Sequence, residues 1–161
     1  MSAKKTIALL CLLAAAGCSD PLERALRATA SIDGKAIEDP ARTGDWLSHG
    51  RTYSEQRFSP LAQINRDNVA QLGLAWYLDI PAKGTVEATP LVADGVIYTT
   101  GSWGVVHAVD ARSGRMIWTY DPQAQKRAAE AVVWDRNRGV ALYQGTCRPE
   151  PSSADRCRSR R

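Results

Sequence analysis

The chain has 161 residues, of which 44% are hydrophobic and 24% are charged, and its formal net charge is +4. This length suggests one domain, and the composition is that of a soluble globular protein rather than a collagen, a coiled coil or a disordered polymer. Residues 148–161 hold five arginines. No aromatic residue alternates with them and no periodic element carries them, so a solvated tail is favoured over nucleic-acid binding.

The first eighteen residues have the three parts of an export signal. Lys4 and Lys5 form the positively charged start, residues 6–16 are apolar, and small residues lead to Cys18. The apolar run is shorter than the roughly 20 residues that a membrane-spanning helix needs. Residues 13–18, Leu-Ala-Ala-Ala-Gly-Cys, resemble a bacterial lipobox, although Ala15 stands where leucine is more common. The resemblance implies a signal peptide over residues 1–17 and a lipid on the sulfur of Cys18. An ordinary signal peptide with an incidental cysteine is the alternative.

The residues after the lipobox bear on location and on cysteine chemistry. Ser19 rather than aspartate follows Cys18, with Asp20 one place later, which resembles the sorting pattern of outer-membrane lipoproteins. We therefore expect a lipid-anchored chain on the periplasmic side of a membrane, with the outer membrane favoured. Outside the signal and the lipid site, the cysteines are Cys147 and Cys157, which an oxidising periplasm would allow to pair. Their spacing does not match a zinc site, which uses two close pairs, so we assign no metal site.

The part of the chain before the first strands has three segments. Residues 18–44 are mixed and polar, with a helix-compatible stretch at 22–30, and indicate a linker between the membrane and a fold that begins near Asp45. An asparagine cap followed by apolar residues at helical spacing predicts a short helix over 65–72. The β-branched and aromatic content of residues 74–80 predicts a strand.

Four short strands are predicted next, at residues 89–93, 96–100, 105–110 and 115–120. The pair Asp94-Gly95 between the first two predicts a tight hairpin turn, because such turns need positive φ angles that glycine adopts without strain. Four antiparallel strands joined by tight turns make one blade of a β-propeller. The apolar residues occur in runs rather than in strict alternation, which is typical of strands that are covered on both faces.

The sequence contains little beyond this blade. Repeat architectures generally need at least about three units for stability. The start of a second copy is predicted at residues 138–143, and the β pattern ends after Gly145. Residues 146–161 have no apolar period, and we expect a disordered tail there, outside the family pattern described below. Such an ending suggests a truncated or frameshifted reading of a longer protein.

Residues 108–118 read Ala-Val-Asp-Ala-Arg-Ser-Gly-Arg-Met-Ile-Trp. They resemble the tryptophan-docking repeat of dehydrogenases that depend on pyrroloquinoline quinone (PQQ), in which A-x-D-x-x-T-G-x-x-x-W recurs in each blade. In that repeat Asp110 and Ser113 would satisfy the backbone of a turn, Gly114 would supply the bend, and Trp118 would pack flat between blades. The repeat alone does not separate these enzymes from other propellers, including non-enzymatic outer-membrane assembly lipoproteins.

Other segments are more specific, and they resemble the N-terminal part of quinoprotein alcohol dehydrogenases in the same order along the chain. They are Trp46, Gly50-Arg51, residues 57–61, 63–65, Asn68-Val69, Leu72, Ala75-Trp76, 87–98 and 137–141. The resembling region is residues 45–145. It implies an all-β fold, namely an incomplete quinoprotein-type propeller whose first four-stranded antiparallel blade is present, preceded by a signal helix. In the family the strand at 74–80 closes the ring by joining the last blade.

The resemblance also implies a cofactor site. The family holds PQQ and calcium near the propeller axis and oxidises alcohols or sugars by hydride transfer to the quinone. Glu87 falls where a glutamate contacts PQQ, and Arg138 falls where an arginine pairs with a PQQ carboxylate, a task that suits a planar guanidinium. Without the resemblance they would be read as a loop carboxylate and a surface charge. Val132-Val133 stands where many alcohol dehydrogenases of this type have two adjacent cysteines, which leaves the substrate open.

The family's calcium ligands and catalytic residues come from later blades, so we assign no catalytic residue and expect the chain alone not to bind PQQ or calcium. No serine nucleophile elbow, P-loop or Rossmann fingerprint offers another chemistry. We expect an oxidoreductase fragment, inactive alone, whose partners would be a membrane, the missing blades and an electron acceptor such as a cytochrome. The alternatives are a non-enzymatic scaffold or binding lipoprotein that presents its blade to a partner propeller, and a blade that closes a ring from its own copies.

Overall fold

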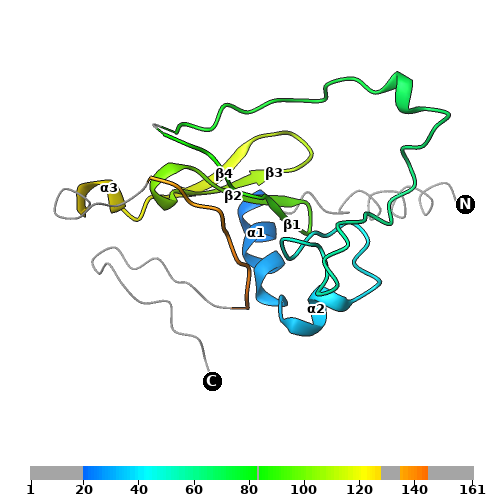
Figure 1. Ribbon diagram of the computed structural model, residues 1–161, viewed down its shortest axis with the longest axis horizontal. Coiled ribbons are helices and arrows are strands. Elements are labelled where there is room, and N and C mark those ends of the chain that lie inside the picture. The colour runs from blue at the N-terminus through cyan, green and yellow to red at the C-terminus, as the bar shows by residue number, and fades with distance from the viewer. Residues whose placement is uncertain (1–19, 83, 128–134, 145–161) are drawn as a thin grey trace, which may run out of the picture.

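The computed structural model describes residues 20–82, 84–127 and 135–144. In this part of the chain an N-terminal helix packs on one face of a four-stranded sheet, and a second, shorter helix follows it beside the core (Figure 1). The expected signal peptide, the lipid site at Cys18, Val132-Val133, and Cys147 and Cys157 lie outside the described residues.

The strands form the expected antiparallel blade. They are β1 (Leu91–Ala93), β2 (Val96–Thr100), β3 (Val106–Asp110) and β4 (Met116–Tyr120), and they pair in the order β1-β2-β3-β4. The bounds of β2 are confirmed, and the other three strands begin one or two residues later than predicted. Asp94 and Gly95, between β1 and β2, have φ angles of 47° and 72°. These are the two positive angles that a tight primed hairpin turn requires.

Asp110 organises the turn between β3 and β4. Its Oδ1 accepts hydrogen bonds from the backbone N–H of Arg112 at 3.1 Å, and from the backbone N–H and the hydroxyl of Ser113, both at 2.9 Å. Gly114 follows with a φ of 70°, an angle that is unstrained only without a side chain. One carboxylate oxygen therefore satisfies three donors and fixes the shape of the turn.

The indole of Trp76 lies against this turn. Its Nε1 donates a hydrogen bond to the carbonyl oxygen of Ala111 at 3.1 Å, and a Cβ on Gly114 would lie 2.5 Å from Cε3 of Trp76. The prediction of a strand over residues 74–80 was wrong for this structure, which has no strand there. A strand needs a neighbour for its backbone hydrogen bonds, and in the described residues this segment is attached through its tryptophan instead.

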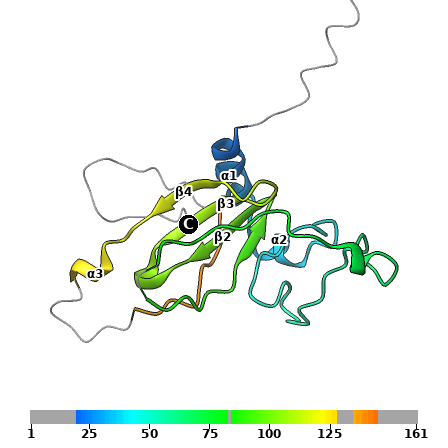
Figure 2. The same ribbon diagram turned by 90° about the horizontal axis from the view of Figure 1, so that it is seen from above.

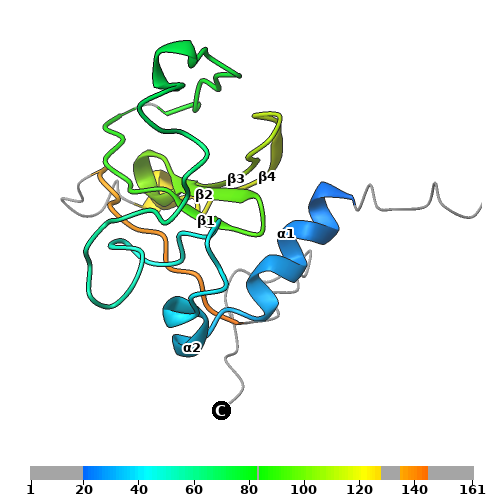
Figure 3. The same cartoon turned by 90° about the vertical axis from the view of Figure 1, so that its right-hand side faces the viewer.

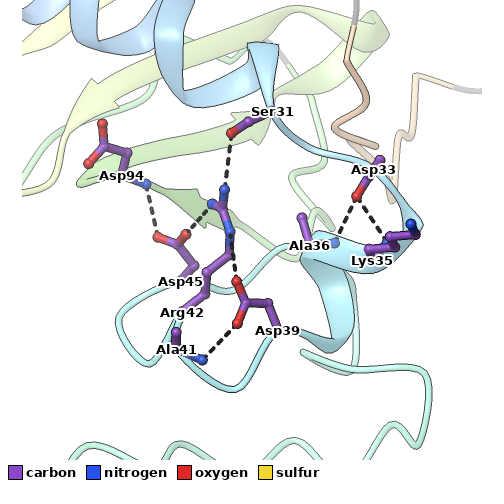
Figure 4. A network of polar contacts seen from close by, with 9 residues as sticks. All are labelled: Ser31, Asp33, Lys35, Ala36, Asp39, Ala41, Arg42, Asp45 and Asp94. Atoms are coloured by element: carbon purple, nitrogen blue, oxygen red, sulfur yellow. Dashed lines mark hydrogen bonds and ion pairs between the residues drawn. The ribbon is translucent and has the colours of Figure 1, made fainter.

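Two helices precede the sheet. In α1 (Pro21–Ala30), Asp20 caps the first turn by accepting a hydrogen bond from Leu22 N at 2.9 Å, and proline occupies the first helical position. In α2 (Gly34–Glu38), Asp33 Oδ1 accepts from two backbone N–H groups of the first turn, at 2.9 and 2.8 Å (Figure 4). Both helices therefore begin at an aspartate that the sequence places just before them.

The core lies between these helices and one face of the sheet. The buried helix-side residues are Ala25, Ala28, Ile32 and Ala36, and the buried sheet residues beside them are Ala93, Val96, Tyr98 and Ala108. The interpretation of residues 18–44 as a linker is therefore corrected, because α1 packs on the blade and residues from both helices belong to the core (Figures 1 and 3). The apolar stripe of these helices consists mostly of alanines, which add little to hydropathy but let a helix approach a sheet closely.

Arg42 ties the loop after α2 to the rest of the fold. Its guanidinium is paired with Asp45 at 2.9 Å and Asp39 at 4.0 Å, and it donates to Ser31 Oγ at 3.0 Å (Figure 4). Asp45 in turn accepts a hydrogen bond from the backbone N–H of Asp94 at 2.9 Å. Through these contacts the β1–β2 hairpin is connected to both N-terminal helices.

The remaining elements are short. They are the 3₁₀ turns Val69–Gln71 and Ser102–Gly104 and the helix α3 (Ala124–Arg127). The helix expected over residues 65–72 is thus reduced to a single 3₁₀ turn. Residues 58–74 loop away from the sheet (Figures 1 and 2), and Trp76 returns to it at the β3–β4 turn. None of the helices within the described ranges has the length and apolar character needed to span a bilayer.

The last described segment, residues 135–144, lies over the core without forming a strand. Val140 and Leu142 are partly buried against the core, and Gln144 N donates to the carbonyl oxygen of Ile32 at 2.7 Å. The predicted start of a second blade at residues 138–143 is therefore not a strand in this structure. The described residues provide no further strands with which it would pair, and it packs against the helical layer instead.

Tyr98 supplies a testable link between the sheet and α1. Its hydroxyl is buried and donates to the carbonyl oxygen of Ala25 at 2.9 Å. Burial, with a contribution from Asp94, raises the pKa of Tyr98 from 10.0 to about 12. Between pH 10.0 and about pH 12, Tyr98 loses its proton in the unfolded state but keeps it in the folded state. The folded state is therefore destabilised as the pH rises through this range.

We expect the free energy of unfolding, measured with urea, to fall by about 2 to 3 kcal/mol from this group as the pH is raised from below 10 to 12. Tyr98→Phe should lack this part of the loss and should be about 1 kcal/mol less stable at pH 7. Tyr77→Phe is the control, because Tyr77 is exposed. An unchanged alkaline profile in Tyr98→Phe would contradict the buried hydroxyl.

Candidate functional site

Glu87 lies between the guanidinium groups of two arginines. Its Oε2 is 2.9 Å from Nε of Arg138, and its Oε1 is 3.3 Å from Nη1 of Arg136. Glu87 precedes β1, whereas Arg138 stands 51 residues later in the last described segment. The structure thus brings together the two residues that the family resemblance assigns to the cofactor. We call these three side chains the Glu87 cluster.

Hydrogen bonds from neighbouring elements position both sides of the Glu87 cluster. Thr100, at the end of β2, donates from its hydroxyl to the carbonyl oxygen of Gly139 at 2.6 Å. Asp135 Oδ2 accepts from Thr85 N at 3.0 Å, and the carbonyl oxygen of Asp135 accepts from Trp103 N at 2.7 Å. The arginine-bearing segment is therefore held beside residues 85–87 by contacts that do not involve the arginines.

The Glu87 cluster is open to water on the side of its arginines. The side chain of Arg138 is 79% exposed and that of Glu87 is 24% exposed. Ion pairs this open to water stabilise a fold by only about 0 to 1 kcal/mol. Two guanidinium groups and one carboxylate leave a formal excess of one positive charge. A carboxylate ligand would find planar, two-point donors in this place.

Arg136 is the member of the Glu87 cluster that sequence reasoning missed. Arg136 and Arg138 are two residues apart, a spacing that places two side chains on one side only where the chain is extended as in a strand. Each arginine then contacts a different oxygen of the same carboxylate. A single charged residue in a loop carries no such information by itself.

The described residues do not enclose the Glu87 cluster in a pocket. A cavity of about 10 Å³ lies beside α2, lined by residues that include Arg42, Asp45 and Arg51, and it does not reach Glu87. It has room for roughly one water molecule, whereas cofactor pockets measure about 300 to 1,000 Å³. Within the described ranges, no group of three or more His, Cys, Asp or Glu side chains is placed to hold a metal ion. In the described structure the Glu87 cluster therefore lies on an open face.

Other residues singled out by the sequence lie in the blade itself. Trp118, on β4, is half-buried, with its ring centroid 6.1 Å from that of Tyr98 at an interplanar angle of 53°. His107, on β3, is fully buried, and burial lowers the pKa of its imidazole. Its Nδ1 lies 3.2 Å from Thr119 Oγ1. We infer a packing role for both residues, because neither contacts the Glu87 cluster in the described structure.

Comparison with known proteins places the chain in a family. Residues 46–161 match the model for the glucose/ethanol/alcohol dehydrogenase β-propeller domain that carries PQQ. The chain is 53% identical over 118 residues to the quinohemoprotein alcohol dehydrogenase ADH-IIG of Pseudomonas putida, covering 72% of this chain and 16% of that protein. It is 48% identical over 106 residues to the 1-butanol dehydrogenase (cytochrome c) of Thauera butanivorans, covering 65% and 15%.

A solved structure agrees with these sequence matches. The crystal structure of the quinohemoprotein alcohol dehydrogenase from Comamonas testosteroni superimposes with a TM-score of 0.70 and 46% identity, over 79% of this chain and 19% of that one. The chain therefore spans less than a fifth of the length of these relatives. The four-stranded blade, the β3–β4 turn on which Trp76 rests and the match over residues 46–161 lead to one conclusion. The chain belongs to the family of PQQ-dependent glucose, ethanol and alcohol dehydrogenase β-propellers.

Proposed function

We propose that this chain is the first blade of a PQQ-dependent dehydrogenase that faces the periplasm, oxidises alcohols or sugars, and is inactive without the rest of its propeller. The observation that carries the proposal is the contact between Glu87 and Arg138 at 2.9 Å on an open face of the blade. The relatives that the chain matches are alcohol dehydrogenases by name, and it spans 15% to 19% of their length. A share of this size corresponds to about one blade of such a propeller, and one blade would supply only part of a cofactor site.

The Glu87 cluster fits one part of the cofactor. PQQ carries carboxylates, and the guanidinium groups of Arg136 and Arg138 are suited to such groups. When bound, PQQ supplies the acceptor for the hydride that leaves the alcohol carbon. Glu87 holds the two arginines in place by pairing with both. The chain's own contribution would be to bind and orient the cofactor.

The remaining parts of such a site would come from the other blades. These are the calcium ligands, the catalytic carboxylate and the walls that exclude water. Two relatives carry haem or cytochrome c in their names, which supports a cytochrome-type electron acceptor for the assembled enzyme. Residues 74–80 would join the last blade and close the ring, which agrees with the exposure of Leu74 and Tyr77 in this structure.

A chimera tests the proposal. Residues 20–144 would replace the matching segment of the P. putida enzyme ADH-IIG, to which the chain is 53% identical over 118 residues. We expect the chimera, loaded with PQQ and calcium, to oxidise short alcohols with an artificial electron acceptor. The isolated chain should show no activity and should bind PQQ more weakly than about 10 μM, because one open face cannot enclose it. A folded but inactive chimera, or micromolar binding by the isolated chain, would contradict the proposal.

Arg138→Ala in the same chimera should weaken PQQ binding about tenfold or more, because it removes a charge-assisted hydrogen-bond donor. PQQ affinity is measured by titrating the apo chimera. Arg66→Ala is the matched control, since Arg66 is an exposed arginine remote in sequence from the cluster. Equal PQQ affinity in Arg138→Ala and Arg66→Ala would remove Arg138 from the cofactor site.

A scaffold role is the second candidate. The segment 58–77 exposes several large apolar side chains, namely Phe58, Leu61, Ile64, Val69, Leu72, Leu74 and Tyr77. Exposed apolar surface of this extent is typical of an interaction surface. If the chain is a binding lipoprotein, it should co-purify from its native host with a separate propeller chain. Sequencing downstream of the gene separates this case from a truncated reading, which predicts further docking repeats in another frame.

We also propose that a lipid on Cys18 anchors the blade to the periplasmic side of a membrane, with the outer membrane favoured. The support is the sequence of residues 13–18, which resembles a lipobox. Mass spectrometry of the mature chain should detect a diacylglyceryl group on Cys18. Cys18→Ser should move the chain from the membrane fraction to the soluble fraction.

A further inference from the structure

The helix nearest the lipid site has two different faces. Ala25 and Ala28 of α1 are buried against the sheet, whereas Leu22 is 46% exposed and Leu26 is 59% exposed. Leu22 and Leu26 are four residues apart, so their side chains lie next to each other on one side of the helix. Covering this pair would remove apolar surface from water, which is favourable.

The leucine pair cannot turn inward, because α1 is fastened to the sheet on its other side. Tyr98 Oη donates to the carbonyl oxygen of Ala25 at 2.9 Å, and Arg24 is paired with Asp110 at 3.0 Å. Both sheet residues are buried. Rolling the helix to hide the leucines would break both contacts, so this face points away from the core.

The neighbouring charges do not oppose contact with an apolar layer. Glu23 and Arg27 are exposed and stand 3.9 Å apart as an i,i+4 pair. The charges of these two side chains cancel. A lipid surface would therefore be bound through the leucines, without a need for anionic headgroups.

The position of Cys18 indicates what covers the leucine pair. Two residues, Ser19 and Asp20, separate Cys18 from Pro21, the first residue of α1, so the chain from Cys18 to Pro21 spans at most about 10 Å. The headgroup region on one side of a bilayer is about 5 to 8 Å thick. A lipid on Cys18 would thus hold the first turn of α1 at the level of the headgroups or directly above them.

We propose that α1 lies in the membrane interface, with Leu22 and Leu26 inserted between the headgroups and the acyl chains. The inference rests on the proposed lipid at Cys18 and goes beyond it, because a lipid alone sets the location of the chain but not its orientation. Because α1 is fastened to the sheet, insertion of the leucine pair would fix the orientation of the blade relative to the membrane.

A fluorescent label tests the leucine pair. In a chain with Cys147→Ser and Cys157→Ser, the lipid occupies the sulfur of Cys18, so an environment-sensitive dye attaches selectively to Leu26→Cys. On phosphatidylcholine vesicles we expect a blue shift of its emission, and loss of emission to lipids brominated on their acyl chains. The matched control is the same dye on Arg27→Cys, one residue along α1, which should report water throughout.

Two results would overturn the inference. One is equal emission and equal quenching at positions 26 and 27. The other is a blue-shifted dye at position 26 in the absence of vesicles, which would mean that protein covers the leucine pair. Circular dichroism of both labelled chains establishes that they are folded.

A second experiment separates failure of the lipid anchor from failure of the α1 inference. If mass spectrometry shows no lipid on Cys18, a Cys18→Ser chain that starts with a histidine tag is tethered to vesicles containing a nickel-chelating lipid. The dye at position 26 still reports whether the leucine pair enters the bilayer. A lipidated chain whose dye at position 26 remains in water overturns the α1 inference and leaves the anchor intact.

Discussion

Gly114→Ala is expected to lower the free energy of unfolding by about 3 kcal/mol or more. The added Cβ would lie 2.5 Å from Cε3 and 2.6 Å from Cδ2 of Trp76, which is closer than carbon atoms approach. The φ of 70° at Gly114 also places any side chain in the left-handed region, at a cost of about 1 to 2 kcal/mol. Trp76 must then leave the turn and lose its hydrogen bond to Ala111.

Urea unfolding measures the loss, and acrylamide quenching of tryptophan emission reports the release of Trp76. Gly73→Ala is the matched control, because a Cβ at Gly73 meets no atom within 4 Å. In a double-mutant cycle, Trp76→Phe should cost stability in the wild-type background and little more in Gly114→Ala. Additive effects of the two changes would show that the ring does not rest on this turn.

Asp110→Ala is expected to cost about 3 to 5 kcal/mol, because it leaves a partly buried guanidinium and two backbone donors without their acceptor. Arg24 is paired with Oδ2 of Asp110 at 3.0 Å, while Oδ1 serves the turn. Asp110→Asn should cost less, since an amide oxygen still accepts hydrogen bonds. Thermal unfolding of the two variants at pH 7 measures the difference.

Because of Asp110, we also expect the stability of the fold to depend on pH in the acid range. Burial acts to raise the pKa of Asp110, but hydrogen bonds from Ser113, the charge of Arg24 and a hydrogen bond from Arg112 hold it below its ordinary value of 3.8. The stability from this carboxylate is therefore fully present above pH 3.8 and is lost as the pH falls through the lower folded-state value. Asp110→Asn should lack this acid loss, whereas Asp79→Asn, at an exposed position, should retain it. Identical acid profiles for all three proteins would contradict the assignment.

What the sequence predicted well was local. The turn at Asp94-Gly95 and the strand β2 depend on neighbouring residues, since turn angles and strand propensity act over a few positions. The strand ends were less well predicted because the ladder, rather than propensity, decides where pairing stops. The blade could thus be identified before any contact was known.

What the sequence missed depends on distant contacts. The alanine stripe of α1 is weakly apolar, and its burial follows from a partner 73 residues away, at Tyr98. Trp76 was placed in a strand because aromatic content favours strands, whereas its indole binds a turn 35 residues later. For the Glu87 cluster, Glu87 and Arg138 were found through family resemblance, and Arg136 required the geometry of the segment that carries it.

The meander order of the strands has a kinetic consequence. Consecutive strands pair, so each hairpin closes a short loop and forms early. The contact between Tyr98 and Ala25 closes a much longer loop, so we expect α1, although it is synthesised first, to dock last. A contact absent from the transition state acts on the unfolding rate and leaves the folding rate nearly unchanged. Until α1 docks, the apolar face of the sheet remains open to water, and in this interval the nascent blade is most prone to aggregation.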